Sequence, residues 1–540
     1  MSSREEPSTT GRTPLRAEIP DALLEAGGLK PGASRAVSNQ TGIPEADIYG
    51  VGSFFHLLAE PHIKVRICQG LSCQMAGSEK LLQQAKAAGL PAAGCSCLAA
   101  CDRPVAALRD RTILPDLTEA DLERAGGNWK SLQSEALGTS ENWKGVVGPT
   151  DTPREQLVID LLGDTDFSGH SLARAQELGP DGVIEAIETS GLQGRGGAGF
   201  PAGFKWKAVR SEARTPRYLV LNADEGEPGT FKDREVLLRR PDRVVEGLLI
   251  AARTVGAQAI YCYLRGEFGG PWRALETAFD RFEQAGLCEG ICWHLHAGHG
   301  AYICGEETAL LEALEGKRGM PRLKPPFPTQ VGLWGQPTLI HNVETIACVP
   351  EIVLRGGEWF ANLGRTGPGT KLYCVSGDVE QPGTYELPLG ISLDELLQVA
   401  GGMRGTLRAF SPGGASSGFL PASERHRPLD FQALKEVDTM LGSAGVVVLN
   451  DQADLAQAVR AQLEFFAQES CGQCAPCRIG TRFQARNLAT LLANKGAGTT
   501  REQIQEVAWE MNEGSICGLG QIASLPLTSA LRWFPEVFEP

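Results

Sequence analysis

The cysteines of this 540-residue chain constrain its fold more than any other feature. There are fifteen of them, and most fall into two distant sets. The N-terminal stretch is polar and acidic and does not resemble a secretory signal, so we expect a cytoplasmic chain. Disulfides are rare in a reducing compartment, and grouped cysteines there indicate metal or redox chemistry. The sets consist of Cys68, Cys73, Cys95, Cys97 and Cys101, and of Cys471, Cys474, Cys477 and Cys517.

The second set predicts a [4Fe–4S] cluster. Cys471, Cys474 and Cys477 follow one another at two-residue gaps in "ESCGQCAPCRIGT". A tight loop of this spacing holds three corners of a cubane and leaves the fourth iron to a remote thiolate. Cys517, in "GSICGLGQ", is the cysteine that comes after the run, so we expect it to be the fourth ligand. Zinc is the alternative, although its structural sites usually have two separated pairs or histidine ligands, and no histidine lies nearby.

The first set predicts a [2Fe–2S] cluster. "CQGLSC" and "CLAAC" provide two cysteine pairs on two loops of a small α/β unit. Two such pairs suit a rhombic cluster, with Cys68, Cys73, Cys97 and Cys101 as ligands. Cys95 is left over and could exchange roles with Cys97. Zinc is an alternative here too, because separated pairs are typical of its structural sites, and a unit without any cluster is another.

Composition argues against two classes of protein. The net charge of −14 at pH 7 disfavours nucleic acid as a partner, because phosphate binding needs clustered lysine and arginine. No apolar run reaches the length of a membrane-spanning helix, so we expect no direct membrane insertion. The other cysteines stand mostly in apolar surroundings, and we expect small buried hydrophobic residues there. They are Cys262, Cys288, Cys292, Cys304, Cys348 and Cys374.

Periodicity and turn signals predict an α/β multidomain protein. "HIKVRIC", "RYLVLNADE" and "AQAIYCYLRGE" read as strands, "VVEGLLIAARTVG" as an apolar helix and "LAQAVRAQLEFFAQES" as an amphipathic one. A chain of this length is too long for one hydrophobic core. We predict a disordered N-terminus (1–19), a helical segment (20–58), a small α/β unit (59–125), a linker (126–150), an α/β domain (151–365), a β-rich module (366–451) and a helical region (452–540).

The glycine-rich stretch "GLQGRGGAGFPAGFKW" predicts a cofactor-binding loop over residues 191–206. A Rossmann fingerprint would need a strand before the glycines and a helix after them. Here the preceding "DGVIEAIETS" looks helical and Pro201 interrupts the residues after the glycines, so we expect no classical dinucleotide fingerprint. The bare backbone N–H groups still suit a phosphate or a flat ring, and Lys205 can supply a cation.

Two acidic motifs accompany this loop. "NADEGEPGTFKDRE" comes after a buried strand, so its polar residues project at the carboxyl end, where open α/β sheets bind ligands. The alternative for this motif is a solvated turn. In "GAYICGEETALLEALEGKRGMPRLKPPFP", Gly305, Glu306 and Glu307 precede an apolar helix, and the carboxylates could instead cap that helix. The candidate ligand-binding residues of the first motif are Asn222, Asp224, Glu225 and Glu227.

Five motifs, in this order, resemble a known family. They are "GRGGAGFPAGFKW", "NADEGEPGTFKDRE", "GAYICGEETALLEALEGKRGMPRLKPPFP", "HNVET" and "ESCGQCAPCRIGT…GSICGLG". Residues 150–540 resemble the NADH-binding flavoprotein (51-kDa-type) subunit of respiratory complex I, a subunit type that also serves as the diaphorase of NAD-linked formate dehydrogenases and hydrogenases. Residues 20–125 resemble its 24-kDa-type companion, here fused. The resemblance implies a thioredoxin-like [2Fe–2S] domain, an FMN/NADH-binding α/β domain, a ubiquitin-like β-grasp domain and a C-terminal helical bundle with the [4Fe–4S] cluster.

The resemblance also implies binding residues, carried over motif by motif. FMN would contact Gly194, Gly196, Gly197, Lys205, Asn222, Asp224, Gly305, Glu306 and Asn342. NADH would bind near Gly197, Phe200, Glu227, Tyr302, Glu307, Lys324 and Phe327. The chain departs from the family in three ways: His341 stands where many members have asparagine, Ala208 replaces an aromatic residue of some members, and the stretch between Cys73 and Cys97 is short.

The flavin would carry the implied activity, taking a hydride from NADH and passing electrons singly to the clusters. Carboxylates at Glu227, Glu306 and Glu307 should repel a 2′-phosphate, which favours NAD over NADP. The chain encodes no destination for the electrons, so we expect an iron–sulfur or catalytic subunit of a larger complex as partner. We favour a molybdenum-containing, NAD-dependent formate dehydrogenase; complex I or an NAD-reducing hydrogenase is the alternative. A non-catalytic iron–sulfur scaffold without flavin is a third hypothesis.

Overall fold

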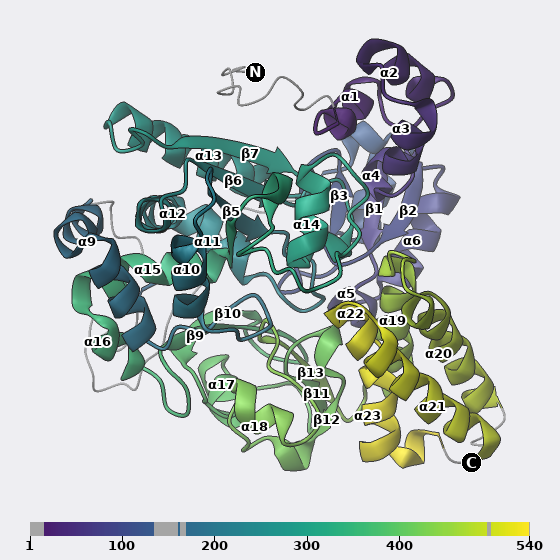
Figure 1. Cartoon of the computed structure of the whole chain (residues 1–540). Coiled ribbons are helices and arrows are strands. Elements are labelled where there is room, and N and C mark those ends of the chain that lie inside the picture. Colours follow the sequence, from purple (N-terminus) through teal and green to yellow (C-terminus); the bar gives the residue numbers. More distant parts are fainter. Residues whose placement is uncertain (1–15, 134–159, 162–168, 494–497, 539–540) are drawn as a thin grey trace.

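The computed structural model describes residues 16–133, 160–161, 169–493 and 498–538. Within these ranges, three β-sheets and the helices around them follow one another along the chain (Figure 1). The predicted disordered start up to residue 15 and the predicted linker from residue 134 lie outside the described residues, and both stay predictions. Among the helices in the described ranges, none is long and apolar enough to cross a membrane.

Short N-terminal helices pack against the middle of the molecule. Leu23 and Phe55 are buried in one core with Ile303, which lies far along the chain. The backbone N–H of Leu57 donates to the carbonyl of His299 at 3.0 Å, so this segment is also tied to the central sheet by hydrogen bonds. The helices are α1 (Ile19–Glu25), α2 (Ala33–Thr41), α3 (Glu45–Gly52) and α4 (His56–Ala59).

The first sheet has the order β2-β1-β3-β4. Strand β1 covers the end of the predicted strand "HIKVRIC"; it pairs in parallel with β2 and antiparallel with β3. Cys68 ends β1 and Cys95 ends β2, side by side. The elements of this N-terminal unit are β1 (Val65–Cys68), α5 (Leu71–Met75), α6 (Ser78–Ala87), β2 (Ala92–Cys95), β3 (Ala107–Arg109), β4 (Thr112–Leu114), α7 (Glu119–Ala125) and η1 (Trp129–Ser131).

The central sheet is parallel, with the order β7-β6-β5-β8. Since parallel strands end at one edge, the carboxyl ends of β5 and β8 lie together. The strands are β5 (Tyr218–Ala223), β6 (Ala259–Leu264), β7 (Cys292–Ala297) and β8 (Thr338–Asn342). The helices are α9 (His170–Thr189), α10 (Ala202–Ser211), α11 (Lys232–Arg239), α12 (Pro241–Val255), α13 (Gly269–Gln284), η2 (Tyr302–Gly305), α14 (Glu307–Leu314), η3 (Leu333–Gly335), α15 (Val343–Arg355) and α16 (Gly357–Ala361).

The glycine-rich stretch connects two helices of this central unit. It runs from the end of α9 to the start of α10, with Pro201 at the N-cap of α10. No strand precedes it among the described residues 169–211, so the expectation that it is no Rossmann fingerprint is confirmed. The buried core behind the sheet is formed by α9, α12 and α15, with Ile187, Leu248 and Ile346 among its residues.

A mixed sheet and a group of helices complete the chain. The sheet has the order β10-β9-β13-β11-β12, with β9 and β13 parallel. The β-rich unit comprises β9 (Thr370–Gly377), β10 (Gly383–Pro388), α17 (Leu393–Val399), β11 (Leu407–Ser411), η4 (Ala415–Ser417), β12 (Leu420–Pro421), η5 (Ala422–Glu424), α18 (Phe431–Lys435) and β13 (Gly445–Asn450). The C-terminal helices are α19 (Leu455–Glu469), α20 (Ala475–Ala493), α21 (Gly498–Gly514), α22 (Gly518–Ile522), α23 (Leu525–Trp533) and η6 (Pro535–Val537).

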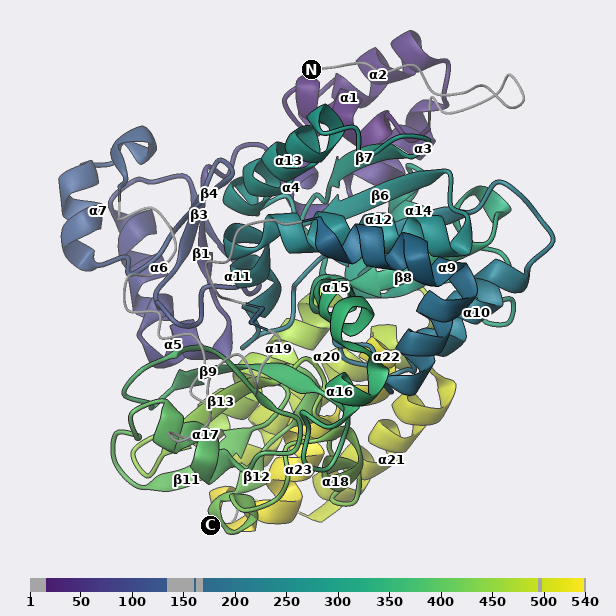
Figure 2. The ribbon, with the colours of Figure 1, turned by 90° about the vertical axis from the view of Figure 1, so that its left-hand side faces the viewer.

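The N-terminal unit touches the other parts rather than standing apart. Figure 2 shows α5 at the lower end of its sheet, next to β9 of the β-rich unit. A hydrogen bond of 2.9 Å between the hydroxyls of Ser72 and Ser376 joins them. Leu71 also shares a buried core with Leu455 and Leu463 of α19. All parts of the described chain therefore meet around the carboxyl edge of the central sheet.

Candidate functional site

A cavity of about 590 Å³, here called the central cavity, opens at this edge. Small-molecule sites usually measure about 300–1,000 Å³, so its size suits a cofactor. Its walls from the central unit include Gly196, Gly197, Asn222, Asp224, Glu225, Gly226, Glu227, Lys232, Asp233, Tyr302, Gly305, Glu306 and Asn342. The β-rich unit adds Gly413, Ser416, Phe431, Lys435, Gly442 and Ser443, and the C-terminal helices add Gly518, Leu519 and Gln521.

The end of β5 forms the floor of the central cavity. The Asn222 side-chain amide donates to the carbonyl of Gly305 at 2.8 Å, which fixes two parts of the wall together. Asp224 comes directly after this strand, and its Oδ2 is buried without a hydrogen-bond partner from the protein. Burial raises the pKa of Asp224 well above its usual value. A buried polar oxygen of this kind is normally hydrogen-bonded, so its free state indicates a bound ligand or water beside it.

Glycines leave backbone exposed on the cavity wall. Gly197 has a φ of +141°, a conformation open to glycine but strained for other residues. A Cβ at Gly226 would lie 2.9 Å from the ring of Tyr302, and one at Gly196 would lie 3.1 Å from Asn342. Gly196 and Gly226 therefore let their loops pack closely against Asn342 and Tyr302, and all three glycines present bare backbone on the cavity wall.

A buried ionic network supports the wall behind the glycines. The Lys232 ammonium donates to Asp233 at 2.7 Å and lies 3.0 Å from Glu344. Glu344 in turn accepts from Lys371 at 2.6 Å, which joins the β-rich unit to the central unit. Asn342 donates its side-chain amide to Asp233. Lys232 and Asp233 belong to the motif "NADEGEPGTFKDRE" but were not predicted as site residues; their position directly after the acidic loop was the available signal.

Lysines pair with the carboxylates beside the cavity. Lys205 contacts Glu307 at 2.8 Å, and Lys324 contacts Glu306 and Glu307 at 2.8 and 2.9 Å. Burial would raise the pKa of Glu307, but the two lysines outweigh it and lower the pKa to about 2. Glu306 also accepts the backbone N–H groups of Thr308 and Ala309, so the predicted alternative of a helix cap is confirmed for this residue.

The predicted binding residues fall into two groups. Most of those assigned to FMN line the central cavity, together with Glu227 and Tyr302, whose hydroxyl donates to Glu227. Phe200 and Phe327 are 45% and 51% exposed. The residues outside the cavity lining are Gly194, Phe200, Lys205, Glu307, Lys324 and Phe327.

The departure at His341 has a structural partner. His341 is buried, and its Nε2 accepts a hydrogen bond of 2.8 Å from the indole N–H of Trp206. Burial lowers the pKa of His341 to about 3, so the ring stays neutral. A neutral ring has one nitrogen that can accept, and here that acceptor, Nε2, is used by Trp206.

The N-terminal cysteines converge on one point. Cys68 ends β1 and Cys73 lies in α5, while Cys97 and Cys101 come from the β2–β3 connection. The sulfurs of Cys97 and Cys101 are 3.4 Å apart, and the Cys68 thiol hydrogen-bonds with those of Cys73 and Cys97. Cys95 is only half-buried. The structure thus brings together the four predicted ligands, while Cys95 lies at the wall of another cavity.

Two buried arginines of the central unit hold this cysteine loop. Arg234 donates to both carboxylate oxygens of Asp102, at 3.2 and 3.0 Å, and to the carbonyl of Ala99. Arg265 donates to the carbonyl of Cys97 at 2.8 Å and to that of Glu225 at 2.6 Å. Sequence reasoning did not find either arginine, because their partners lie about 130–170 residues away.

The acidic loop between β5 and α11 contacts both the central cavity and this cysteine site. Residues 224–227 line the cavity, and the backbone N–H of Gly229 hydrogen-bonds to the sulfur of Cys101. A backbone N–H aimed at a sulfur is the usual outer-shell contact of an iron–sulfur ligand.

The C-terminal cysteines meet between α19, α20 and α22. Arg478 donates to the carbonyl of Gly472 at 2.6 Å and so closes the turn that carries two of them. The four thiols lie close enough for their charges to interact. Cys477 interacts with the three others, and Cys471 also interacts with Cys474 and with Cys517. Cys471 and Cys474 lie in the turn after α19, Cys477 in the first turn of α20, and Cys517 directly before α22.

The C-terminal site also reaches the central cavity. Gly518 and Leu519, directly after Cys517, line that cavity. A Cβ at Gly520 would lie 2.9 Å from that of Cys477, so α22 approaches the cysteine run closely. The backbone N–H groups of Leu519 and Gly520 hydrogen-bond to the Cys517 sulfur.

The thiols of this site are not activated nucleophiles. Burial raises the pKa of Cys477 to about 12 and that of Cys517 to about 11. Catalytic cysteines have a lowered pKa, whereas metal ligands lose their proton on binding the metal. Over the described ranges, no three His, Cys, Asp or Glu side chains are grouped to hold a single metal ion.

Cys292 is exposed, so the prediction of a buried residue is wrong there; the five other dispersed cysteines are buried as predicted.

Models of known families match four parts of the chain. The Nuo51 FMN-binding domain matches residues 187–351, and the SLBB domain matches residues 372–420. The NADH-ubiquinone oxidoreductase-F iron–sulfur binding region matches residues 457–540. The thioredoxin-like [2Fe–2S] ferredoxin matches residues 21–125. Both cysteine sets therefore lie in iron–sulfur regions, which leaves the zinc alternatives without support.

The second F-type NADH-quinone oxidoreductase subunit of Rhizobium meliloti (strain 1021) is 45% identical over 393 residues, which cover 70% of this chain and 93% of that protein. The chain belongs to the F-type family of NADH-quinone oxidoreductase subunits. The F-type subunit of Rickettsia typhi (strain ATCC VR-144 / Wilmington) is also 45% identical, over 71% of this chain and 97% of that protein. As a member of this family, the chain is an oxidoreductase subunit that depends on FMN and iron–sulfur clusters.

Solved structures extend the match to the N-terminal unit. The NAD⁺-reducing [NiFe]-hydrogenase in the H2-reduced state contains a chain with a TM-score of 0.86 and 33% identity, covering 97% of this chain and 93% of that one. Its air-oxidised form matches with a TM-score of 0.85 over 98% and 94%. The predicted α/β multidomain fold class is confirmed, with a thioredoxin-like [2Fe–2S] domain, an FMN-binding domain and a helical iron–sulfur region; the SLBB match lies where the β-grasp domain was predicted.

The central cavity fits FMN on the evidence of its own residues. Its volume of about 590 Å³ is large enough for the cofactor, and bare glycine backbone forms part of its wall. The buried Asp224 Oδ2 has no hydrogen-bond partner in the protein and could bond the cofactor. Each cysteine site presents four converging thiols with backbone N–H groups aimed at its sulfurs, which suits iron–sulfur ligation.

Proposed function

We propose that this chain is the NADH dehydrogenase (diaphorase) subunit of a larger redox complex, with FMN held in the central cavity. The observation that carries the proposal is that this cavity adjoins both cysteine sites. The acidic loop contacts the cavity and Cys101, and the segment directly after Cys517 also lines the cavity. An electron carrier in the cavity would thus lie next to both clusters.

FMN supplies the conversion of a two-electron donor, NADH, into single electrons that iron–sulfur clusters can accept. The residues of the chain would bind and orient it. Gly196 and Gly197 would lie along the ring system, Asn222 and Asp224 would bond its polar edge, and Asn342 would bond a further polar group. Cys471, Cys474, Cys477 and Cys517 would hold the [4Fe–4S] cluster, and Cys68, Cys73, Cys97 and Cys101 the [2Fe–2S] cluster.

NADH would bind on the side of the cavity where Phe200, Glu227, Tyr302 and Phe327 lie. The structure refines the reason for preferring NAD over NADP. Glu306 and Glu307 are already paired with lysines, so they repel a 2′-phosphate less than free carboxylates would. Glu227, which accepts from the Tyr302 hydroxyl and the Ser416 backbone, is then the main source of discrimination.

The partner is proposed from the extent of the similarity. Sequence reasoning favoured a formate dehydrogenase, and none of the relatives or structures compared supports that choice. Those relatives are complex I subunits or part of an NAD⁺-reducing hydrogenase, which supports the alternative better. The hydrogenase chain matches the fused N-terminal unit as well, so we propose a complex of the hydrogenase-diaphorase type, located in the cytoplasm.

The test is purification of the chain with its native partners. We expect a flavin absorption band, two distinct iron–sulfur EPR signals after reduction by NADH, and NADH–ferricyanide activity. Absence of bound flavin together with intact clusters would instead support the iron–sulfur scaffold. Equal kcat/KM for NADPH and NADH would contradict the predicted NAD preference. A co-purifying nickel–iron, molybdenum or membrane subunit would identify the complex.

A further inference from the structure

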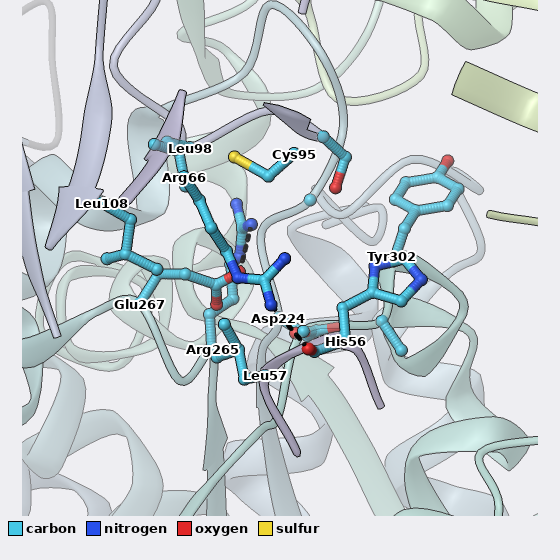
Figure 3. A pocket seen from close by; sticks show the side chains of 14 residues that line it. His56, Leu57, Arg66, Cys95, Leu98, Leu108, Asp224, Arg265, Glu267 and Tyr302 are labelled. Carbon is cyan, nitrogen blue, oxygen red and sulfur yellow. Dashed lines mark hydrogen bonds and ion pairs between the residues drawn. The ribbon is translucent and has the colours of Figure 1, made fainter. Parts of the chain in front are cut away.

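A second, smaller cavity lies between the N-terminal unit and the central unit. It has a volume of about 20 Å³ and is walled by residues of both, including His56, Arg66, Cys95 and Glu267. Figure 3 shows the Arg66 side chain reaching across this inner cavity towards Asp224 and His56, with Tyr302 beyond them. Arg66 donates to the carbonyl of His56 at 2.8 Å and to the half-exposed Glu60 at 2.9 Å.

The inner cavity shares walls with two other spaces. Asp224, Gly226 and Tyr302 line both the inner cavity and the central cavity. On its other side, Leu57 and Arg66 line both the inner cavity and a groove of about 300 Å³ below the N-terminal helices. The inner cavity is therefore the neighbour of both the proposed flavin site and a groove at the junction of the units.

Buried polar atoms without a hydrogen bond to the protein face these spaces. Asp224 Oδ2 borders the central and inner cavities, and Glu267 Oε2 borders the inner cavity. On the side of the groove, His299 Nε2 has no hydrogen bond and lies 4.0 Å from a carboxylate oxygen of Asp21. Buried polar groups are normally satisfied, so the free oxygens of Asp224 and Glu267 on the walls of one small cavity indicate bound water.

The inner cavity is large enough to hold a water molecule. A site needs about 10–15 Å³ and two to four polar partners to hold one water molecule, and this one offers about 20 Å³. Asp224, Glu267 and Arg66 supply the polar partners. Arg265 lies 3.1 Å from Glu267, so the carboxylate is charge-compensated while its second oxygen stays free. Burial raises the pKa of Asp224, which favours a proton on that carboxyl group.

We propose that these spaces form a hydrated passage that carries protons between the central cavity and the groove, through Asp224, a water in the inner cavity, and Glu267. The inference rests on the proposed function, because that function creates the need. Oxidation of NADH yields NAD⁺, two electrons and one proton. The electrons leave through the clusters, whereas the proton must reach solvent separately. A nucleotide bound beside Glu227 and Tyr302 would cover that side of the cavity, and the passage would offer a separate exit for the proton.

Glu267→Gln is the sharpest variant. It keeps the shape and the contact with Arg265 but cannot take up and release a proton. Glu276→Gln, an exposed residue of the same region on α13, is the matched control. Leu57→Phe places a larger side chain between the inner cavity and the groove, at a half-buried position that lines both. All three leave the proposed flavin and nucleotide contacts untouched.

Proton release is followed with a pH indicator while NADH reduces ferricyanide in a stopped-flow mixer. Wild type and Glu276→Gln should release the proton together with electron transfer. Glu267→Gln and Leu57→Phe should release it severalfold later. In redox difference infrared spectra, a carboxyl band should disappear in Glu267→Gln alone. A crystal structure of the wild type should hold a water between Asp224 and Glu267.

Proton release at the wild-type rate in both variants would overturn the passage, as would a dry inner cavity. These outcomes are separable from a failure of the proposed function. If NADH does not reduce the bound flavin, the function fails and no proton is released by any variant. If flavin reduction is normal while the timing of proton release is unaffected, the passage alone is wrong.

Discussion

The two cysteine sites differ in how completely the chain encloses them. Cys68, Cys73, Cys97 and Cys101 are each at most 3% exposed. They lie where the N-terminal unit contacts the acidic loop of the central unit. At the C-terminal site, Cys471 and Cys474 are only half-buried. One site is thus closed within the protein, and the other reaches its surface.

Charge separates the two sites as well. The N-terminal site has two buried cations, Arg234 and Arg265, directly on its cysteine loop. The C-terminal site has one exposed cation, Arg478, on its cysteine turn and also a carboxylate, since Glu306 is an electrostatic neighbour of both Cys471 and Cys517. Fixed cations favour the more negative, reduced form of a cluster, and carboxylates disfavour it.

This contrast indicates which site passes electrons outwards. Exposed apolar side chains lie on the helices next to the C-terminal site, where Ile479 is 63% and Trp509 is 66% exposed. A half-open cluster beside apolar surface suits transfer to a partner. A cluster closed in by arginines suits storage, because it can accept an electron from the cavity but has no surface of its own through which to pass it on.

The largest expected effect comes from removing one ligand at each site. Cys517→Ser should abolish the [4Fe–4S] EPR signal and nearly all electron transfer from NADH to the partner subunit. Cys97→Ser should abolish the [2Fe–2S] signal while most of this transfer remains. Both variants should keep their flavin band, which serves as the control for folding. The assigned roles of the two sites are wrong if Cys97→Ser stops transfer to the partner while Cys517→Ser does not.

The arginines of the closed site provide the next largest effect. Arg234→Ala leaves Asp102, which is 5% exposed, without its bidentate partner. Breaking a buried ion pair in this way should lower the free energy of unfolding by about 3–5 kcal/mol. Loss of the cation should also make the midpoint potential of the [2Fe–2S] cluster more negative. Calorimetry and potentiometric EPR measure these two effects.

Arg234→Lys separates them. Lysine keeps the charge but cannot form the planar fork, so we expect a near-native potential with a partial loss of stability. An unchanged potential in Arg234→Ala would show that the buried cation does not set the properties of the closed site.

The sequence could predict contacts between residues that lie close together along the chain, but not contacts between distant segments. Short spacings identified both cysteine sets, and the strand before Asn222 placed the floor of the cavity. Gly413 and Ser443 close the cavity from another unit, and nothing in their local sequence marks them. The same holds for Arg234 and Arg265, whose contacts join distant segments. The lysines that pair with Glu306 and Glu307 were named as ligand contacts, but their pairing needed the fold.

Glu307, on the side of the half-open C-terminal site, should make the free energy of unfolding depend on pH. The pKa of Glu307 falls from 4.5 to about 2 in the folded protein. Its ionised form therefore stabilises the fold above pH 4.5, and this contribution is lost as the pH falls towards 2. By linkage it amounts to at most about 3 kcal/mol. Glu307→Gln should be less stable at pH 7, and its difference from wild type should vanish near pH 2. A constant difference at all pH values in denaturant titrations would contradict the ion-pair explanation.

The smallest change in the free energy of unfolding at neutral pH is expected for a substitution of His299, which lies on the side of the closed N-terminal site. Burial, with nearby His296 and Arg111, lowers its pKa from 6.5 to about 3. Between these values the unfolded state binds the extra proton, so wild type should lose stability by about 1.4 kcal/mol per pH unit below 6.5. His299→Gln should match wild type closely at pH 7 and lack this loss, whereas His426→Gln, at an exposed histidine, should behave like wild type. Because the His299 carbonyl accepts from Leu57, the N-terminal helices should loosen first, and hydrogen exchange at pH 5 would detect this. If Glu307→Gln rather than His299→Gln removed the loss between pH 6.5 and 5, the two sides of the molecule would not respond to acid separately.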